Sequence, residues 1–439
     1  MEKRMSTRYD GIIIGAGIIG GCIGFELAKR GLRTLNIDKL PAAGYGSTSE
    51  TCGIIRFHYS TPAGVALARE GYYYWLDWPK YIGVVDEAGM AQYRNTGALI
   101  IKTPKNHHLK HVMASLDELK VAYDDLDAEG IARLFPALDT RQYGPPVGPN
   151  DPRFGQPTGS ALTGAIYLPE SGYINDPQLS CHNVQRAAEA RGGTFLFNAR
   201  VVDIIITGGR AAGVRLADGT EIHAPIVINA AGPHSYQINR MAGVEGGMKI
   251  KTRPLKQEVA HVPAPAGLDY NLQGLLISDG DVGCYSRPEV GNNVLIGSED
   301  PECDVLEYVD DPDTYDKNFT EQWRTQIIRK AQRIRDLPIP NKRQGLVSLY
   351  DQSDDWIPIY DTSDLPGFYM AVGTSGNQYK NGPTVGILMT ELITRVEAGH
   401  DHDRNPVTFN WKYTRRTCNI GFFSRLREIN TASSFSVIG

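Results

Sequence analysis

The chain has 439 residues, a length typical of two domains rather than one. With 45 Lys and Arg against 50 Asp and Glu, the net charge is −5, which removes any global electrostatic case for nucleic acid or anionic membrane as a partner. A hydrophobic fraction of 41% excludes a largely disordered chain, and six cysteines without a CxxC pair indicate neither a disulfide framework nor a zinc site.

The N-terminal region predicts a strand, a glycine-rich turn, a helix and a second strand. Residues 9–14 predict a buried strand, 21–30 have the apolar spacing of a helix, and 34–37 predict the second strand. The turn between the first strand and the helix reads Gly15-Ala16-Gly17-Ile18-Ile19-Gly20. This order is typical of a dinucleotide-binding unit, with Asp38 placed to bind an adenosine ribose. The identity of the dinucleotide stays open at this point.

The apolar N-terminal stretch is not expected to cross a membrane. Glycines interrupt residues 12–25, charged residues follow at once, and no stretch of the chain approaches the roughly 18 uninterrupted apolar residues that a span needs. We therefore expect a cytoplasmic protein without a transmembrane span.

The middle and the end of the chain predict further elements of the same kind. A helix is expected over 177–191, before a meander whose turns are marked by Gly208-Gly209 and Asp218-Gly219. The predicted strands are 195–197, 201–206, 212–216, 221–223 and 226–230, with two more at 292–297 and 368–372. A glycine turn follows residue 372, and a helix is expected over 383–398.

These elements predict two interleaved domains and an extension. A nucleotide-binding domain is expected from residues 1–75, 150–240 and 345–400, and a substrate-binding domain from 76–149 and 241–344. The second domain is expected over the crevice at the carboxyl ends of the strands, where such sheets bind ligands. Residues 401–439 form a basic, aromatic C-terminal extension. It could cover an interface with another chain, but we favour packing against its own domain.

Five separated motifs carry a family resemblance over nearly all of residues 8–400. They are Gly15-Ala16-Gly17-Ile18-Ile19-Gly20; Gly46-Ser47-Thr48-Ser49 running into Gly53-Ile54-Ile55-Arg56; Val227-Ile228-Asn229-Ala230-Ala231-Gly232-Pro233; Ser348-Leu349-Tyr350 running into Asp355-Trp356-Ile357-Pro358; and Gly373-Thr374-Ser375-Gly376-Asn377-Gln378-Tyr379-Lys380. In this order they resemble the flavoprotein oxidoreductases of the D-amino-acid oxidase and glycine oxidase family, and within it the monomeric sarcosine oxidases and related amino-acid dehydrogenases.

The resemblance implies an α/β fold. A Rossmann-type FAD-binding domain, similar to that of glutathione reductase, would be interleaved with an α+β substrate domain built on an antiparallel sheet. The implied cofactor is FAD, held without a covalent bond. The implied cofactor-binding residues are Gly15, Gly17, Ile18, Ile19 and Gly20 at the pyrophosphate; Asp38 and Lys39 near the ribose; Ser47, Thr48 and Ser49 along the cofactor; Val202, or its neighbour Val201, at the adenine; Ala231 and Gly232 near the flavin; and Gly376, Asn377, Gln378 and Lys380 at its pyrimidine edge.

The resemblance also implies the reaction and the residues that support it. Arg56 and Lys380 would bind the substrate carboxylate, since two cations in a partly dry pocket fix an anion and Arg adds planar, bidentate geometry. Tyr350 would lie near the substrate, and Tyr285 is a weaker candidate for a similar place. The expected substrate is an amino acid or N-alkyl amino acid with a carboxylate. Its C–N bond would be oxidised by hydride transfer to flavin, giving an imine that water hydrolyses. The electrons would pass to oxygen or another acceptor.

Two alternatives stay open beside this reaction. The chain could oxidise a hydroxy acid or a polyol phosphate, as other FAD enzymes of this fold do. It could also be a flavoprotein subunit of a multi-subunit dehydrogenase.

Three positions depart from the family pattern. Ser348 stands where the sarcosine oxidases have the cysteine that bonds the flavin, so no thioether is expected, and His58 is expected to pack or hydrogen-bond rather than to bond the flavin. The late motif has Gly376-Asn377-Gln378 where the family usually has Gly-His-Gly. Leu295 takes the place of a lysine found in oxygen-using members, which favours a dehydrogenase.

Other polar clusters predict no further site. His107, His108 and His111 have helical spacing but no nearby carboxylate, so no metal site is expected there or elsewhere. The acidic cluster Asp310, Asp311 and Asp313 is expected to be a solvated loop.

Overall fold

The computed structural model describes residues 9–159 and 161–438, in which a six-stranded sheet carries the dinucleotide motif. The strand order is β20-β21-β13-β1-β2-β9, and every pairing is parallel except that of β20 with β21. The strands are β1 (Gly11–Ile14), β2 (Thr34–Ile37), β9 (Thr194–Leu196), β13 (Ile226–Asn229), β20 (Ile359–Asp361) and β21 (Phe368–Val372). Parallel strands buried on both faces read as continuous apolar runs, as β1 does.

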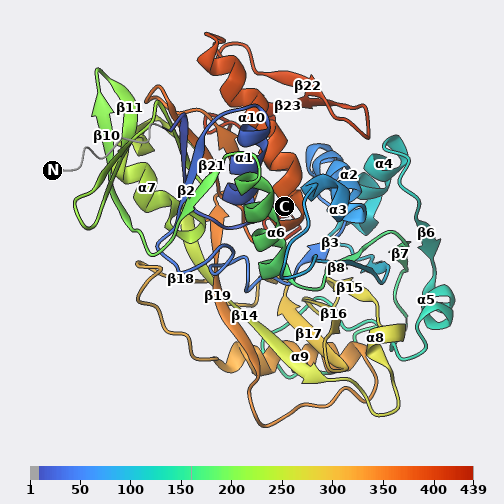
Figure 1. Ribbon diagram of the computed structural model, residues 1–439. Coiled ribbons are helices and arrows are strands. Elements are labelled where there is room, and N and C mark those ends of the chain that lie inside the picture. The colour runs from blue at the N-terminus through green and yellow to red at the C-terminus, as the bar shows by residue number, and fades with distance from the viewer. Residues whose placement is uncertain (1–8, 160, 439) are drawn as a thin grey trace.

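Different layers cover the two faces of this sheet (Figure 1). Successive side chains of β1 point to opposite faces, so Ile13 packs with the helices and Ile12 with the meander. The helices are α1 (Ile18–Lys29), α6 (Pro177–Glu189) and α10 (Gly382–Glu397). The meander consists of β10 (Val201–Thr207), β11 (Arg210–Leu216) and β12 (Glu221–His223), and α7 (Ser235–Met241) lies beside it.

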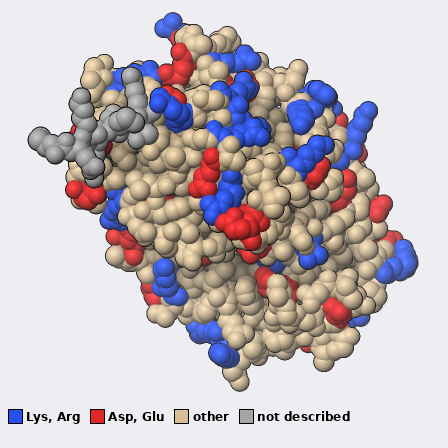
Figure 2. Space-filling model, in the orientation of Figure 1, with Lys and Arg blue, Asp and Glu red and all other residues tan. Residues whose placement is uncertain are grey.

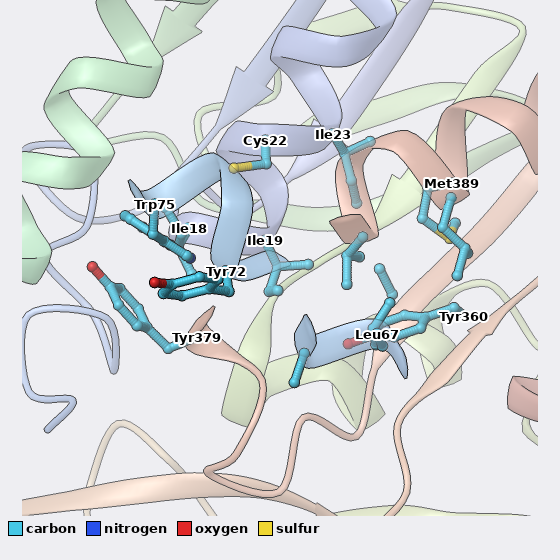
Figure 3. Packing of buried hydrophobic residues seen from close by; sticks show 14 of the residues in the cluster. Ile18, Ile19, Cys22, Ile23, Leu67, Tyr72, Trp75, Tyr360, Tyr379 and Met389 are labelled. Atoms are coloured by element: carbon cyan, nitrogen blue, oxygen red, sulfur yellow. The ribbon is translucent and has the colours of Figure 1, made fainter. Parts of the chain in front are cut away.

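The helix layer is packed so closely that two helices meet through their backbones. A Cβ at Gly386 of α10 would lie 2.6 Å from the carbonyl oxygen of Cys22 in α1, which leaves no room for a side chain. Figure 3 shows Cys22 and Ile23 of α1 and Met389 of α10 in this core. Trp75 of α2 (Pro62–Leu76) stacks on Tyr379, with ring centroids 5.3 Å apart. The core therefore fixes the turn that contains Tyr379.

A second, nine-stranded sheet forms the other half of the molecule. Its order is β18-β14-β17-β16-β15-β5-β7-β6, with β19 also paired to β14, and its only parallel pairing in the described chain joins β5 to β15. The strands are β5 (Ala98–Ile101), β6 (Asp124–Leu126), β7 (Ala165–Leu168), β14 (Thr252–Pro263), β15 (Leu276–Asp279), β16 (Cys284–Glu289), β17 (Asn293–Ser298), β18 (Glu307–Tyr308) and β19 (Gly345–Ser353). Helix α9 (Glu321–Arg333) packs against it, and its buried Arg333 pairs with Asp279 and Asp281 at 2.7 and 2.8 Å.

Shorter elements complete the described chain. A small sheet contains β3 (Ile54–Ile55), β8 (Gly172–Ile174) and β4 (Tyr93–Asn95), and the remaining helices are α3 (Trp78–Ile82), α4 (Lys110–Glu118), α5 (Ala128–Leu134) and α8 (Tyr270–Gln273). Strands β22 (Thr408–Asn410) and β23 (Thr417–Asn419) form a hairpin after α10.

The predicted fold class is confirmed by the two sheets, while the division into domains stays a prediction. Strands β7 and β19 fall inside segments assigned to the nucleotide domain but pair within the larger sheet. The first helix begins at Ile18, three residues before its expected start at Gly21. It starts directly after Gly17 because Thr48, which is distant in sequence, accepts a hydrogen bond from the Ile18 amide at 3.1 Å.

The C-terminal extension packs back onto the chain. Arg425 is buried and pairs with Asp361, Asp364 and Asp403 at 3.2, 2.9 and 2.8 Å. Beyond this anchor the chain runs back to Arg56, which directly follows β3. There the backbone carbonyl of Val437 accepts a hydrogen bond from Arg56.

The surface agrees with the weak net charge. Figure 2 shows Lys and Arg side chains interspersed with Asp and Glu on one face of the molecule. Within the described ranges, none of the helices has both the length and the apolar character needed to span a membrane.

Candidate active site

One cavity of about 500 Å³ joins the two sheets, and most of the predicted site residues line it. It extends from the carboxyl ends of β1 and β2 to side chains of β14, β15, β16 and β19. The predicted cofactor residues that line it are Gly15, Gly17, Ile18, Ile19, Asp38, Lys39, Ser47, Thr48, Val202, Ala231, Gly232, Gly376, Asn377, Gln378 and Lys380.

Two predicted cofactor residues do not line this cavity. Gly20 packs beneath the turn, where a Cβ would lie 2.3 Å from the carbonyl oxygen of Gly15, so its role is the close helix–strand packing. Ser49 is exposed, and its hydroxyl donates to the Gly46 carbonyl at 2.9 Å. The contact of Ser49 with the cofactor stays a prediction, and in this structure a local turn uses its hydroxyl.

The glycine turn forms a cradle for a phosphate. Gly15 has a φ of +116°, and a Cβ there would lie 2.3 Å from the carbonyl oxygen of Ala230. Gly17 precedes the first turn of α1, where backbone N–H groups and the helix dipole favour an anion. The Asp38 carboxylate accepts hydrogen bonds from the amides of Ala16 and Leu40 at 2.8 and 2.9 Å, which holds the cradle against the end of β2. The residues present thus fit a dinucleotide.

Charged side chains gather at the nucleotide end of the cavity. The Lys39 ammonium lies 2.7 Å from His234 Nε2 and pairs with Asp313, which also pairs with Arg200. Burial raises the pKa of Asp313, but hydrogen bonds from Lys39 and His234 outweigh burial and lower that pKa to about 2. Asp313 lies in an exposed turn, as expected for a solvated acidic loop, and the fold also brings these cations to it.

Arg56 and Lys380 come together at the other end of the cavity. The Arg56 guanidinium lies over the ring of Tyr59, 4.3 Å from its centroid, and donates to the carbonyls of His58 and Val437. The Lys380 ammonium donates to Tyr59 Oη at 2.8 Å and to the carbonyl of Asn377 at 2.9 Å. Both cations are more than nine-tenths buried. The structure therefore supports the predicted pairing of these two residues in one pocket.

The electrostatics of this pocket favour an anion. Burial, followed by the charge of Arg56, holds the pKa of Lys380 well below its usual range. Burial also lowers the pKa of His58 far below 6.5, with further contributions from Arg56 and Lys380, and His58 Nδ1 has no hydrogen-bond partner among the described residues. His58 is therefore a neutral imidazole, and a carboxylate would relieve the repulsion between the two cations.

Two tyrosines form the next part of the cavity wall. Tyr285 Oη lies 3.2 Å from Cys52 Sγ, and burial raises the pKa of both Tyr285 and Tyr350, so both phenols are neutral. The Tyr350 ring covers Gly376, where a Cβ would lie 2.3 Å from the ring and where φ is +69°. Gly376 thus lets the late turn and the tyrosine approach each other.

The positions that depart from the family pattern have structural partners. The Ser348 hydroxyl donates to Glu50 at 2.5 Å. Gln378 Oε1 accepts hydrogen bonds from Tyr360 at 3.0 Å and Asn381 at 2.7 Å, which orders the late turn from behind. Leu295 is buried in an apolar cluster with Val259 and Tyr285.

Several residues that line the cavity or contact its lining have no counterpart in the sequence predictions. Tyr59, which bridges the two cations, could have been suspected because it follows Arg56 by three residues. Glu299 lies in an insertion where residue spacing carries little information, and Val437 and Ile438 reach the cavity from the C-terminal extension. No signal in the sequence points to these three.

A dinucleotide cradle that opens into a buried cationic pocket is typical of an oxidoreductase with a nucleotide cofactor. The chain belongs to the DAO family of FAD-dependent oxidoreductases, whose family model matches residues 10–392. Its cofactor is therefore FAD.

Individual relatives match over almost their whole length. Glycine oxidase of Geobacillus kaustophilus (strain HTA426) is 25% identical over 90% of this chain and 96% of its own. Monomeric sarcosine oxidase of Bacillus sp. (strain B-0618) is 24% identical over 90% of this chain and 95% of its own. The crystal structure of L-proline dehydrogenase from P. horikoshii has a TM-score of 0.74 at 21% identity, covering 95% of this chain and 97% of that one, and shows the shared fold.

Proposed function

We propose that this protein oxidises the C–N bond of an amino acid or N-alkyl amino acid that carries a carboxylate. The observation that carries the proposal is the convergence of Arg56 and Lys380, both buried, on the cavity that the cofactor turn also lines. Two desolvated cations of this kind bind a carboxylate strongly, and Arg orients it through parallel N–H donors. The names of the relatives, which act on glycine, sarcosine and L-proline, support an amino acid as the substrate.

Each group of the pocket has a part in this reaction. Arg56 and Lys380 fix the carboxylate, so the neighbouring carbon, its C–H bond and the nitrogen take a set orientation. Tyr350 and Tyr285 wall the cavity, while Val437 and Ile438 limit its contact with water. Bound FAD supplies the acceptor for two electrons and a hydrogen from that carbon. The substrate leaves as an imine, which water hydrolyses.

The proposal extends to the cofactor linkage, the acceptor and the location of the enzyme. FAD is bound without a covalent bond, because Ser348 stands where the sarcosine oxidases have the cysteine that bonds the flavin. The Ser348 hydroxyl instead donates a hydrogen bond to Glu50. The electron acceptor is oxygen or another oxidant, and the apolar setting of Leu295 favours the second. All six cysteines are unpaired, which suits the reducing cytoplasm.

The proposal is tested by an absorbance titration of the FAD-loaded protein without oxygen. Glycine, sarcosine, L-proline, other D- and L-amino acids, glycolate and glycerol 3-phosphate are added in turn, and air is admitted afterwards. Bleaching of the flavin by an amino acid supports the proposal, and slow recolouring in air identifies a dehydrogenase. Bleaching only by glycolate or glycerol 3-phosphate, or by none of the compounds, would overturn it.

A further inference from the structure

A buried carboxylate, Glu299, lines the same cavity and has no part in the proposal above. It directly follows β17 and is only 9% exposed. Its Oε1 accepts hydrogen bonds from Ser278 Oγ at 2.6 Å and from the amide of Asp279 at 3.1 Å. Its Oε2 has no hydrogen-bond partner among the described residues. One oxygen therefore fixes the side chain, and the other accepts no hydrogen bond from the described residues.

Glu299 is electrostatically coupled to the carboxylate-binding end of the pocket without being paired to it. Burial lowers the pKa of Arg56, and the negative charge of Glu299 offsets part of that shift. Among the described residues, however, no ion pair within 4.0 Å joins these two groups. The charged and titratable groups that act on Glu299 or are acted on by it are Arg56, Lys330, Asp279, Cys284 and Asp300.

A cationic pocket and an unpaired carboxylate in one cavity match the two charges of a zwitterion. An amino acid carries its carboxylate and its ammonium on the same carbon, so it can bridge cations and an anion that do not touch each other. A buried carboxylate oxygen without a hydrogen bond is costly, and a bound ammonium would satisfy Oε2 of Glu299. A simple hydroxy acid offers no such group.

We propose that Glu299 Oε2 accepts a hydrogen bond from the substrate's ammonium and takes its proton, which makes Glu299 a catalytic residue that selects zwitterionic amino acids. This inference rests on the proposed function. One N–H bond breaks and one O–H bond forms, so the ammonium becomes a neutral amine and the glutamate a carboxylic acid. The electron pair of the broken bond stays on nitrogen, where the C=N bond needs it.

The protonation behaviour of Glu299 suits this step. Burial raises its pKa above the usual value, although the Ser278 hydrogen bond opposes the shift. A weaker carboxylic acid is a stronger conjugate base, so the pKa difference between Glu299 and an ammonium is reduced, and proton transfer becomes easier.

The experiment compares the parent with Glu299→Gln as FAD-loaded proteins, over pH 6 to 10 without oxygen. The probes are glycine, sarcosine and L-proline for flavin reduction, and propionate, which has no nitrogen, for binding monitored by the flavin spectrum. At pH 7 we expect Glu299→Gln to reduce the second-order rate constant of flavin reduction by about 100-fold, because only the scarce neutral amine then reacts. The deficit should shrink as pH rises, while propionate affinity should stay within about twofold, since the carboxylate ligands are untouched.

Two further variants separate a chemical role from a structural one. Ser278→Ala removes the 2.6 Å hydrogen bond that positions Glu299, and we expect a smaller loss with the same rescue at high pH. Glu302→Gln changes an exposed glutamate three residues away and should leave every measurement unchanged.

The possible results distinguish this inference from the proposed function. Equal loss at all pH values together with weaker propionate binding would show a structural role and overturn the inference. A Glu299→Gln protein that behaves like the parent would overturn it as well. If no amino acid reduces the parent at any pH, the proposed function fails, and the inference fails with it.

Discussion

Arg56 would bind the substrate carboxylate through both its positive charge and its planar pair of N–H donors, and substitutions can separate these two contributions. Its guanidinium stacks over Tyr59 and donates to two backbone carbonyls, so it is held in place before any substrate arrives. We expect Arg56→Ala to raise the dissociation constant of a carboxylate ligand by about 100-fold, because charge-assisted hydrogen bonds contribute roughly 1.5–3 kcal/mol each. Titration of the flavin spectrum with propionate measures this.

The matched control for Arg56 is an arginine remote from the cavity. Arg33 forms an exposed pair with Asp10, and Arg33→Ala should bind propionate like the parent. Arg56→Lys keeps the charge but loses the planar pair of donors, so it should fall between the parent and Arg56→Ala. Parent-like binding by Arg56→Ala would remove this residue from the carboxylate site.

Lys380 predicts how substrate binding depends on pH. Its pKa is held well below its usual range by burial and by Arg56, so its positive charge is present at low pH and is lost as pH rises through that lowered value. Carboxylate affinity should therefore fall with rising pH. In Lys380→Met the affinity should be weaker at neutral pH and nearly flat over the same range. The pH series of propionate dissociation constants tests this, and an identical slope in both proteins would contradict it.

At the scale of elements, the C-terminal extension depends on one buried arginine. Arg425 pairs with Asp361 and Asp403 beneath the segment that leads to Val437. Replacing it by Ala removes the cation that pairs with the buried Asp361 carboxylate, and breaking a buried ion pair typically costs about 3–5 kcal/mol. We expect Arg425→Ala to lower the free energy of unfolding by about that amount and to make residues 426–438 sensitive to protease.

The control for this prediction is an exposed ion pair in the same extension. Lys249 pairs with Glu428 at the surface, and Lys249→Ala should change the free energy of unfolding by less than about 1 kcal/mol. Urea unfolding and limited proteolysis measure both variants. An extension that stays protease-resistant in Arg425→Ala would show that other contacts hold it.

Apolar spacing and turn residues in the sequence predicted several helices and strands close to their observed bounds. Strands β2, β12 and β21 have the predicted bounds, and β1 and α6 differ by a few residues. Most strands of the larger sheet could not be predicted, because their partners lie far apart in the chain; β5, for example, pairs with both β7 and β15. The start of α1 was missed for a similar reason, since Thr48 caps it from a separate loop.

The candidate site, too, contains residues that the sequence predicted and residues that it could not predict. Arg56 and Lys380 stand in motifs that the sequence displays, and the fold brings both to one pocket. Glu299 and Val437 could not be predicted, because their place in the cavity follows from the pairing of β17 with β14 and from the anchoring of the extension. Single residues of this kind are defined only by the assembled molecule.

At the scale of the whole molecule, the cofactor should couple the two sheets. The cavity is lined by the ends of β1 and β2 and also by residues of β14, β16 and β19, so these residues of both halves would hold FAD. At a free concentration of 1,000 times its dissociation constant, FAD should stabilise the protein by about 4.1 kcal/mol. We expect one cooperative transition that moves to higher temperature with added FAD.

Calorimetry of the apoprotein with increasing FAD tests this coupling. Riboflavin, which lacks the pyrophosphate that the Gly15 cradle would bind, serves as the control ligand and should shift the transition far less. Two separate transitions, of which FAD moves only one, would contradict the expected coupling of the sheets.

The most direct test of the account is the isotope dependence of flavin reduction without oxygen. The substrate is the amino acid that bleaches the flavin, compared with the same compound deuterated on the carbon that bears the nitrogen, and the products are analysed after one turnover. We predict that deuterium slows reduction several-fold and that, after hydrolysis of the imine, the carbon that lost deuterium is a carbonyl carbon, which makes the product an oxo acid where that carbon bears the carboxylate. Reduction without an isotope effect and with the C–N bond intact in the product would contradict oxidation of that bond.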